Sequence, residues 1–514
     1  MHKIRNISSL PQKLSLILIL FGIFLGSWFF LHNDLTFHTD IARDFLLLED
    51  IVHVKPLTLI GPRAGGIPGV FHGPLWLYIN IPAFVIGNGN PVIVAWGWLL
   101  FFIASVWGMW HVSKKMFGTE VAYLSTLLYT FTTAGLVKDS FNPSGAVYLS
   151  PLFLYFLYLY IKENKGVYLA VTYFILGLLI QFQMAFGVPI ALITTCIVLF
   201  HIGKKKEFKH ILFMSTIILP LSSYILFEIK HDFLQVRSVI NFLTGVENAG
   251  KVHTSTSKFL YDRMQGFTRS GISFIGHNFP LLIAATWTTI IAGLVSHKKT
   301  FNDKLIYFLI GSFYIGFWAC TLIFKGVIWS YYYWPLTPLL IILIASTYKL
   351  IDKRIFFVAY ILLLGFNVIN LTKDSYKASA YIGTGKTGGT WQYYYKPAQD
   401  IFASAPSEFG YFIYTADQFG YSSRYAMNYA QKANENKIAK PFQKSEKTYL
   451  LTFPAHDHPY TNEKWWKAGQ VKIDRKPNLI HKYNSNFYIE EYDLTPEEVR
   501  VAPDPNLLHT IIFR

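Results

Sequence analysis

About eleven long apolar runs dominate the sequence and decide what it can fold into. A helix that crosses a bilayer needs about 20 apolar residues. Charged residues make up only 15% of the chain, against roughly a quarter in soluble domains. The pattern therefore predicts a polytopic α-helical membrane protein with about eleven transmembrane helices. The runs lie near residues 14–31, 91–111, 118–137, 145–161, 166–182, 184–200, 211–227, 280–296, 305–324, 333–349 and 355–371.

Basic residues alternate between the loops that join these runs. The basic loops are HVSKKMFG, IKENKG, HIGKKKEFKH, SHKKTFNDK and YKLIDKR, whereas KDSFNPSG and QFQMAFG carry almost no positive charge. Cytoplasmic loops of membrane proteins carry the excess of lysine and arginine. We therefore expect a multi-pass plasma-membrane protein with a cytoplasmic N-terminus, whose long outside loops are 32–90 and 228–279. The first run is too long for a signal peptide and precedes no small-residue cleavage site, so we expect a retained helix.

The composition changes after the last apolar run. Residues 372–514 are polar, and GYFIYTAD, KTYLLTFPA and LIHKYNSNFYIEEYDL have the character of strands. SSRYAMNYAQKANENK has the character of a helix. We expect two parts: a membrane domain over 1–371 and a small extracytoplasmic α+β domain over 372–514.

Charge and cysteine content limit the partners. The formal net charge is +16, with the basic residues scattered among apolar runs and no basic arm. This favours contact with membrane lipids or phosphate-bearing substrates and argues against nucleic acid. The two cysteines, Cys196 and Cys320, lie far apart in apolar runs, so neither a disulfide framework nor a cysteine metal site is expected.

The stretch FHTDIARDFLLLED places acidic residues directly after the first apolar run. Apolar residues recur every three or four positions from Asp40 to about Val54, which predicts an amphipathic helix at the membrane surface. Asp40 and Asp44 share one face of it, and Arg43 can pair with Asp40 across one turn. One interpretation is a solvated polar face with Asp40 as the N-cap. The other is a carboxylate base whose pKa is tuned by a like charge and a desolvating membrane.

The same outside loop continues with GPRAGGIPGVFHGPLWLYINIPAFVIG. Its glycines and prolines predict irregular backbone, after which His72-Gly73-Pro74 opens an apolar run over 75–86. That run is too short to span, so we expect a re-entrant or surface helix. A helix N-terminus with a histidine beside it is a natural phosphate site, although His72 is equally suited to a capping role.

The DxxRD-type helix, the GP…HGPLWLY segment, a piece around 139–143 and YYYWPLTP at 331–338 resemble the C-type glycosyltransferases that use polyprenyl-phosphate sugars. The protein O-mannosyltransferases and the lipid A aminoarabinose transferase are the most similar subgroup. The sequence departs from the pattern at two positions. Ile41 stands where a second acid often follows the first, and Tyr332 stands where an arginine is usual.

The resemblance implies an inverting transfer of a sugar from a polyprenyl-phosphate carrier to a lipid, glycan or protein acceptor on the outer face. This reaction requires no cofactor, and the resemblance leaves a divalent metal possible without implying one. Asp40 is the first candidate for the base and Asp44 the second. Arginine suits phosphate because its planar fork binds two oxygens, although contact with lipid head groups is the plainer role. The candidates for substrate or phosphate binding are His72, Arg63, Arg43, Arg237, Arg263, Arg269, Asp139, Asn142, Tyr332 and Tyr333.

Three other functions stay open. An oligosaccharyltransferase or polymerase that uses a lipid-pyrophosphate donor usually needs a metal-binding acid pair, and the sequence offers none that is obvious. The two histidines of PAHDHPY (454–460) are not expected to bind a metal, because the sequence offers no third ligand nearby. A lipid or solute transporter tends to carry ionisable or broken sites at mid-membrane, but here the ionisable residues gather in outside loops. A receptor without chemistry does not explain so many helices.

Overall fold

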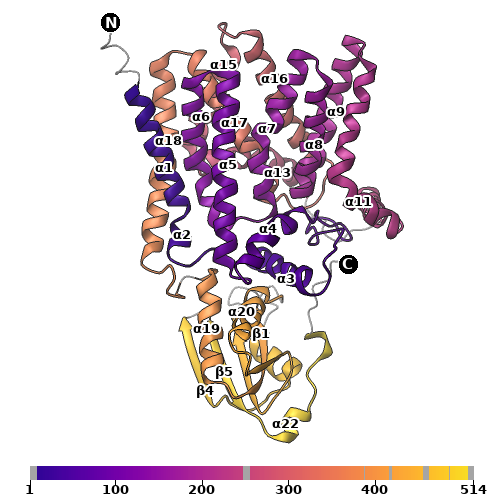
Figure 1. Ribbon diagram of the computed structural model, residues 1–514, viewed down its shortest axis with the longest axis vertical. Helices are drawn as coiled ribbons and strands as arrows, with labels where there is room; N and C mark the ends of the chain where they lie inside the picture. Colours follow the sequence, from indigo (N-terminus) through magenta and orange to yellow (C-terminus); the bar gives the residue numbers. More distant parts are fainter. Residues whose placement is uncertain are drawn as a thin grey trace.

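The computed structural model describes residues 9–246, 255–386, 388–415, 419–454, 462–484 and 487–507. Eleven helices form an upright bundle (Figure 1) and coincide one for one with the predicted apolar runs. Several of the predicted runs also include a short helical turn at one end, such as η1 (Ala134–Asp139) after α6. The bundle helices are α1 (Ser9–Gly26), α5 (Pro91–Phe117), α6 (Thr119–Thr133), α7 (Asn142–Glu163), α8 (Gly166–Phe182), α9 (Met184–Lys205), α11 (Ile218–Lys230), α15 (Pro280–Val295), α16 (Phe301–Thr321), α17 (Leu336–Ser346) and α18 (Lys353–Ser379).

Length and apolar character single out part of this bundle as membrane-spanning. Within the described ranges, six helices are long and apolar enough to cross a membrane by themselves. A seventh span arises if Thr256–Gly276 and Pro280–Val295, which are bent by 102° at their junction, count together. The remaining apolar helices are shorter, including those at Gly166–Phe182 and Leu336–Lys349. The protein is therefore a polytopic helical protein, and the count of eleven spans stays a prediction.

Two helices lie across one end of the bundle, between it and the C-terminal domain (Figure 1). They are α3 (Thr39–His53) and α4 (Leu75–Ile86), which confirm the two predicted helices of the first loop. α3 is not solvated on one face as an isolated surface helix would be. Eight of its residues are buried, Asp44 among them. α12 (Leu234–Thr244) and α13 (Thr256–Thr268) come from the loop over 228–279 that the sequence predicts to lie outside.

The C-terminal domain follows α18, which remains helical to Ser379, beyond the predicted boundary at 371. Its five-stranded sheet has the order β2-β1-β3-β5-β4. Strands β2, β1 and β3 are parallel to one another, and β5 pairs antiparallel with both of its neighbours, β3 and β4. The α+β prediction is confirmed, and each predicted strand or helix is present. The main elements are α19 (Trp391–Ser404), β1 (Glu408–Tyr414), α20 (Tyr421–Lys432), β2 (Ile438–Pro441), β3 (Lys447–Thr452), β4 (Leu479–Asn484) and β5 (Phe487–Asp493).

One apolar core joins the bundle, the crossing helices and the near face of this sheet. Phe37 and Phe45 lie at the junction, where their rings contact Tyr425 of α20 at centroid distances of 5.8 and 5.2 Å. Asp34 is fully buried beside them and accepts hydrogen bonds from the backbone N–H groups of Gly383 and Gln392, both at 3.0 Å. The C-terminal domain is therefore fixed against the helix that carries the predicted catalytic acids.

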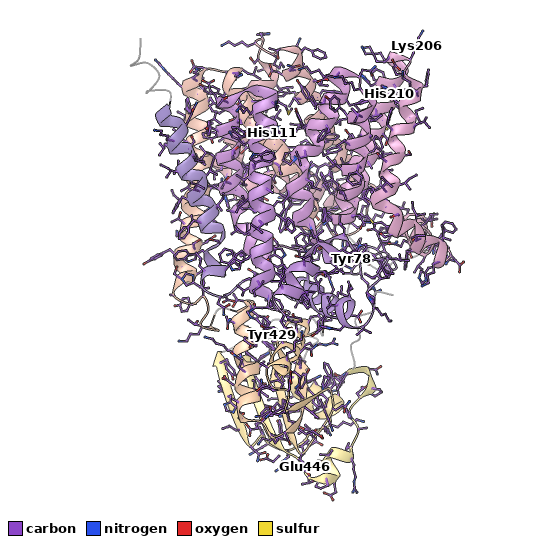
Figure 2. All side chains as sticks on the ribbon, viewed as in Figure 1. Tyr78, His111, Lys206, His210, Tyr429 and Glu446 are labelled. Atoms are coloured by element: carbon purple, nitrogen blue, oxygen red, sulfur yellow. The ribbon has the colours of Figure 1, made fainter. Side chains whose placement is uncertain are left out.

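Two predicted loops lie at opposite ends of the molecule, whereas the cytoplasmic or outer location of each end stays a prediction. Lys206 and His210, from a predicted cytoplasmic loop, lie at the end where the described chain begins (Figure 2). Glu446, in the C-terminal domain, lies at the opposite end, and Tyr78 of α4 lies between them.

Candidate functional site

The first turn of α3 is organised by the residue before it. His38 has extended backbone and its Nδ1 accepts a hydrogen bond from the Asp40 N–H at 3.1 Å, so His38 is the N-cap. The expectation that Asp40 caps the helix is wrong, because Asp40 already lies inside the first turn. Its carboxylate is thereby released from capping and points to other partners.

Asp40, Arg43 and Asp44 form one ion cluster on that turn. Arg43 Nη1 donates to Asp40 Oδ1 at 2.6 Å, which confirms the predicted pairing across one turn. Arg43 Nε and Nη2 donate to Asp44 Oδ1 at 3.2 and 3.0 Å. The two carboxylates differ in exposure: the Asp40 side chain is 38% exposed and that of Asp44 is 6% exposed.

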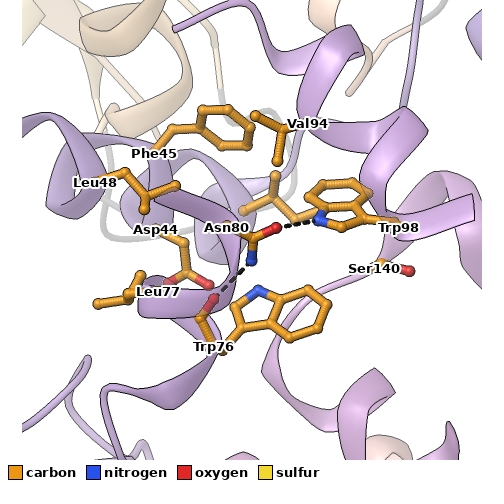
Figure 3. Close-up of a pocket in the computed structure, with 10 residues that line it drawn as sticks. Asp44, Phe45, Leu48, Trp76, Leu77, Asn80, Val94, Trp98 and Ser140 are labelled. Atoms are coloured by element: carbon orange, nitrogen blue, oxygen red, sulfur yellow. Dashed lines mark hydrogen bonds between the residues drawn. The ribbon is translucent and has the colours of Figure 1, made fainter. Parts of the chain in front are cut away.

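Asp44 lines a small pocket between α3, α4 and α5 (Figure 3). The pocket measures about 10 Å³ and has room for roughly one water molecule. Asn80 closes it by donating to the Trp76 carbonyl and accepting from Trp98 Nε1. Asp44 Oδ2 is buried without a hydrogen-bond partner among the described residues. Burial raises the pKa of Asp44 to about 6, against the lowering effect of Arg43.

His38 also links α3 to the connection between α6 and α7. Its Nε2 lies 3.0 Å from Asp139 Oδ1. Burial by itself lowers the pKa of His38, but the bond to Asp139 and the negative charges of Asp139, Asp40 and Asp44 outweigh it, and the pKa is raised. The His38 ring meets Phe141 edge-on at 5.4 Å, and Phe141 meets Tyr331 in the same way at 5.5 Å. The predicted residue Asp139 thus joins the site through a histidine.

His72 and the tyrosines after α16 surround the same cluster. Burial, and next the positive charge of Arg43, lower the pKa of His72 to about 4, whereas Asp40 opposes this. His72 is therefore neutral near pH 7 and offers a ring N–H rather than a positive charge. Burial raises the pKa of Tyr332 to about 12, with a further contribution from Asp40. Both side chains therefore experience the charge of Asp40.

Comparison with known proteins relates this architecture to a known fold. A family model described as dolichyl-phosphate-mannose-protein mannosyltransferase matches residues 72–227. The apo crystal structure of ArnT from Cupriavidus metallidurans matches with a TM-score of 0.60 at 9% identity, over 94% of this chain and 98% of that chain. The chain has the C-type glycosyltransferase (GT-C) fold.

A second ArnT structure from the same organism, bound to undecaprenyl phosphate, gives a TM-score of 0.54 at 10% identity, over 95% of this chain and 99% of that chain. No curated protein sequence matches the chain. The resemblance to C-type glycosyltransferases that the sequence predicts is confirmed.

Other predicted binding residues lie away from the Asp40 cluster, and some of them serve the fold. Arg263 donates to the carbonyls of Thr321, Phe324 and Gly326 at 3.2, 2.9 and 2.9 Å, so it holds the chain that leaves α16. Asn142 is buried and donates to the Phe182 carbonyl at 3.0 Å, which ties α7 to the end of α8. Tyr333 lines a separate cavity of about 280 Å³ with Arg263 and Trp318.

Three predicted arginines are exposed. Arg63 follows the irregular segment before α4, where it forms an isolated bridge with Phe71. Arg237 lies on α12, and Arg269 ends α13. The structure does not bring them into hydrogen-bond contact with the Asp40 cluster. They remain available to a ligand or to lipid head groups.

The structure also adds residues that the sequence did not single out. His38 stands two residues before the predicted helix start at Asp40, where a capping search limited to the usual Ser, Thr, Asp and Asn misses it. Tyr421 of α20 lies near Arg43 and contributes to the raised pKa of Arg43 after the larger effects of Asp44 and Asp40. Nothing local in the sequence connects Tyr421 with a helix almost 400 residues earlier. No group of three metal-ligating side chains occurs in the described part of the chain, and PAHDHPY lies almost wholly outside it.

Proposed function

We propose that the protein is an integral-membrane glycosyltransferase that moves a sugar from a polyprenyl-phosphate carrier to an acceptor on the outer face. The observation that carries this is the Asp40–Arg43–Asp44 cluster at the start of α3, within a GT-C fold. The family-model match and the ArnT structure that contains undecaprenyl phosphate support this type of donor. The acceptor is a lipid, a glycan or a protein of the cell envelope, and the reaction takes place at the plasma membrane.

Asp40 is the general base in this proposal. A base must reach the proton that it removes, and Asp40 is the more exposed carboxylate of the cluster. Asp44 is buried against Asn80 and Trp98, so it acts through Arg43 and not on the acceptor. Arg43 in turn holds the Asp40 carboxylate in place through its 2.6 Å bond.

The chemistry is a single displacement. The acceptor oxygen or nitrogen forms a bond to the anomeric carbon from the face opposite the carrier, while the bond from that carbon to the phosphate oxygen breaks. The acceptor proton goes to Asp40, the electron pair leaves with the polyprenyl phosphate, and the configuration inverts.

The leaving phosphate needs hydrogen-bond donors and positive charge. Arg43 uses three of its five N–H groups on the two aspartates, which leaves two for a ligand. His72 adds a neutral N–H donor and Tyr332 a hydroxyl. Because Asp40, Arg43 and Asp44 together carry a net negative charge, further cations are needed, and we assign this role to Arg63 and Arg269.

A donor panel tests the proposal. Purified protein in lipid vesicles is mixed with polyprenyl-phosphate sugars, with polyprenyl-pyrophosphate sugars, and with envelope lipids or proteins as acceptors. We expect release of free polyprenyl phosphate, with the sugar recovered on an acceptor by mass spectrometry. Consumption of pyrophosphate donors only, or movement of the lipid across the vesicle without cleavage, supports instead the oligosaccharyltransferase or the transporter.

A further inference from the structure

Helix α12 has three sides that differ in burial and polarity. Its inner side, with Gln235 and Phe242, is buried against the protein. Its outer side carries an apolar stripe made of Phe233, Val236, Ile240 and Leu243, all between 48% and 56% exposed. Beside the stripe lies an exposed polar row made of Arg237, Asn241 and Thr244.

The helical repeat separates these two outer rows cleanly. At 3.6 residues per turn, the three stripe positions inside the helix, 236, 240 and 243, fall within about 60° of one another, and the polar row lies about 100° further round. Phe233 precedes them as the N-cap. A helix surrounded by water has no reason to gather four large apolar side chains on an exposed sector. A helix in the boundary between acyl chains and water requires both rows.

The inner side of α12 is held firmly, so the direction of the stripe is fixed. Gln235 Oε1 accepts a hydrogen bond from the Phe71 N–H at 2.9 Å, and both groups are buried. Gly69, at φ +79°, lies so close that an added Cβ would be 2.3 Å from Ser238 Oγ. These contacts join α12 to the segment that ends in His72.

The stripe continues a surface that already faces the membrane. Residues Phe208–Lys230, which end in α11, qualify as a span with only 17% of their apolar window buried. Ile225, Leu226 and Ile229 on this span are exposed. In Figure 1 the chain turns out of the bundle after α11, at the level of α3 and α4. The apolar surface of the span therefore passes directly into the stripe through Ile229 and Phe233.

We infer that α12 is an interfacial helix that lies in the outer leaflet, with the apolar stripe against acyl chains and Arg237 among the head groups. Through Gln235 and Ser238 it holds the His72 segment at the depth of the head groups. This inference concerns the bilayer itself and stands whether or not the proposed sugar transfer is correct.

The adjacent residues Ile240 and Asn241 provide a matched pair for the test. The only two cysteines, Cys196 and Cys320, are first replaced by serine and alanine. Ile240→Cys and Asn241→Cys are then labelled with the fluorophore NBD, in vesicles of phosphatidylethanolamine and phosphatidylglycerol. We expect the probe at 240 to emit at shorter wavelength, to be quenched at least twofold more by doxyl-labelled lipid than the probe at 241, and to resist aqueous iodide. The probe at 241 should show the opposite pattern.

Three results would overturn the inference. Equal iodide quenching at both positions places α12 in water, and equal lipid quenching places the whole helix inside the bilayer. Short-wavelength emission at 240 without lipid quenching indicates a protein surface, such as a second copy. The neighbouring pair Leu243→Cys and Thr244→Cys repeats the comparison, and size-exclusion chromatography with the thermal midpoint shows that each variant is folded.

Discussion

Asp40 and Asp44 share one arginine but have different surroundings. Both bind Arg43 within 3.2 Å. Asp44 faces the α4–α5 side, where burial raises its pKa to about 6, whereas the Asp40 side chain remains 38% exposed. One helical turn thus supplies an accessible carboxylate and a buried one, and the two should respond differently to the same substitution.

Replacement of Asp40 by asparagine should remove the base and leave the fold intact. General base catalysis contributes about 10²- to 10⁴-fold, so we expect kcat to fall by at least about 100-fold. The matched control is Asp50→Asn on the same helix, which removes an equal charge three turns away and should keep near wild-type activity. An Asp40→Asn protein that transfers sugar at the normal rate would show that the base lies elsewhere.

Asp44 should make the stability of the protein depend on pH. Its folded pKa, about 6, exceeds its ordinary value of 3.8, so the folded state prefers the protonated form. The stabilisation is fully present below pH 3.8 and is lost as the pH rises through about 6. The shift corresponds to about 3 kcal/mol. The thermal midpoint of the wild type relative to Asp44→Asn should therefore fall between pH 4 and pH 6.5. A difference that does not change with pH would contradict this environment for Asp44.

His38 should act by positioning Asp40. His38→Ala loses the cap, which costs about 1 kcal/mol of stability, together with the link to Asp139. His38→Asn keeps a capping acceptor but is too short to reach Asp139 in the same way. We expect the stability to recover in His38→Asn while kcat stays roughly fivefold lower, as for one lost hydrogen bond.

Asp139→Asn should lower kcat to a similar extent as His38→Asn, and the double variant should lose little more, because the two residues act as one unit. Recovery of full kcat in His38→Asn would show that the histidine only caps the helix.

Local sequence patterns predicted part of this site and missed the rest for a physical reason. The pairing of Arg43 with Asp40 follows from helix periodicity alone. The exposure of each carboxylate does not, because it depends on α4, α5 and α20, which are distant in sequence. The structural role of Arg263 was missed for a similar reason, since three of its N–H groups bind carbonyls that its own segment does not contain.

At the scale of elements, α3 connects the membrane bundle to the C-terminal domain. Asn428 and Lys432 of α20 bind Glu49 of α3, both at 3.0 Å. Ser422 donates to the Phe37 carbonyl at 2.9 Å. The amphipathic pattern of this helix predicted its existence and its bounds within one residue. It did not predict that the C-terminal domain would cover the face expected to meet water.

Tyr425→Phe should weaken this junction. The buried Tyr425 hydroxyl donates to the Gly89 carbonyl at 2.5 Å, and its loss leaves that carbonyl without this donor. An unsatisfied buried group costs about 1–3 kcal/mol, so we expect a lower thermal midpoint and a reduced transfer rate. Tyr376→Phe, at a side chain that is 80% exposed, removes the same atom and should change neither. Equal midpoints for the two variants would show that the domain is held by other contacts.

For the whole molecule, the apolar runs predicted the helices of the bundle, because each helix depends on residues close together in sequence. The layered order of bundle, crossing helices and sheet depends on long-range packing, which periodicity does not encode. This layered order matters for the proposed function. It places the Asp40 cluster at the end opposite Lys206, on the side of the C-terminal domain.

Labelling with a membrane-impermeant maleimide tests which end faces outward. Single cysteines are placed at Lys206 and at Glu446, which lie at opposite ends (Figure 2). The basic loop around Lys206 should remain in the cytoplasm, so Glu446→Cys should react in cells with an intact plasma membrane and Lys206→Cys only after permeabilisation. The reverse pattern would place the Asp40 cluster inside, where nucleotide-activated sugars are available. The reason for a lipid-phosphate donor at this site would then be lost.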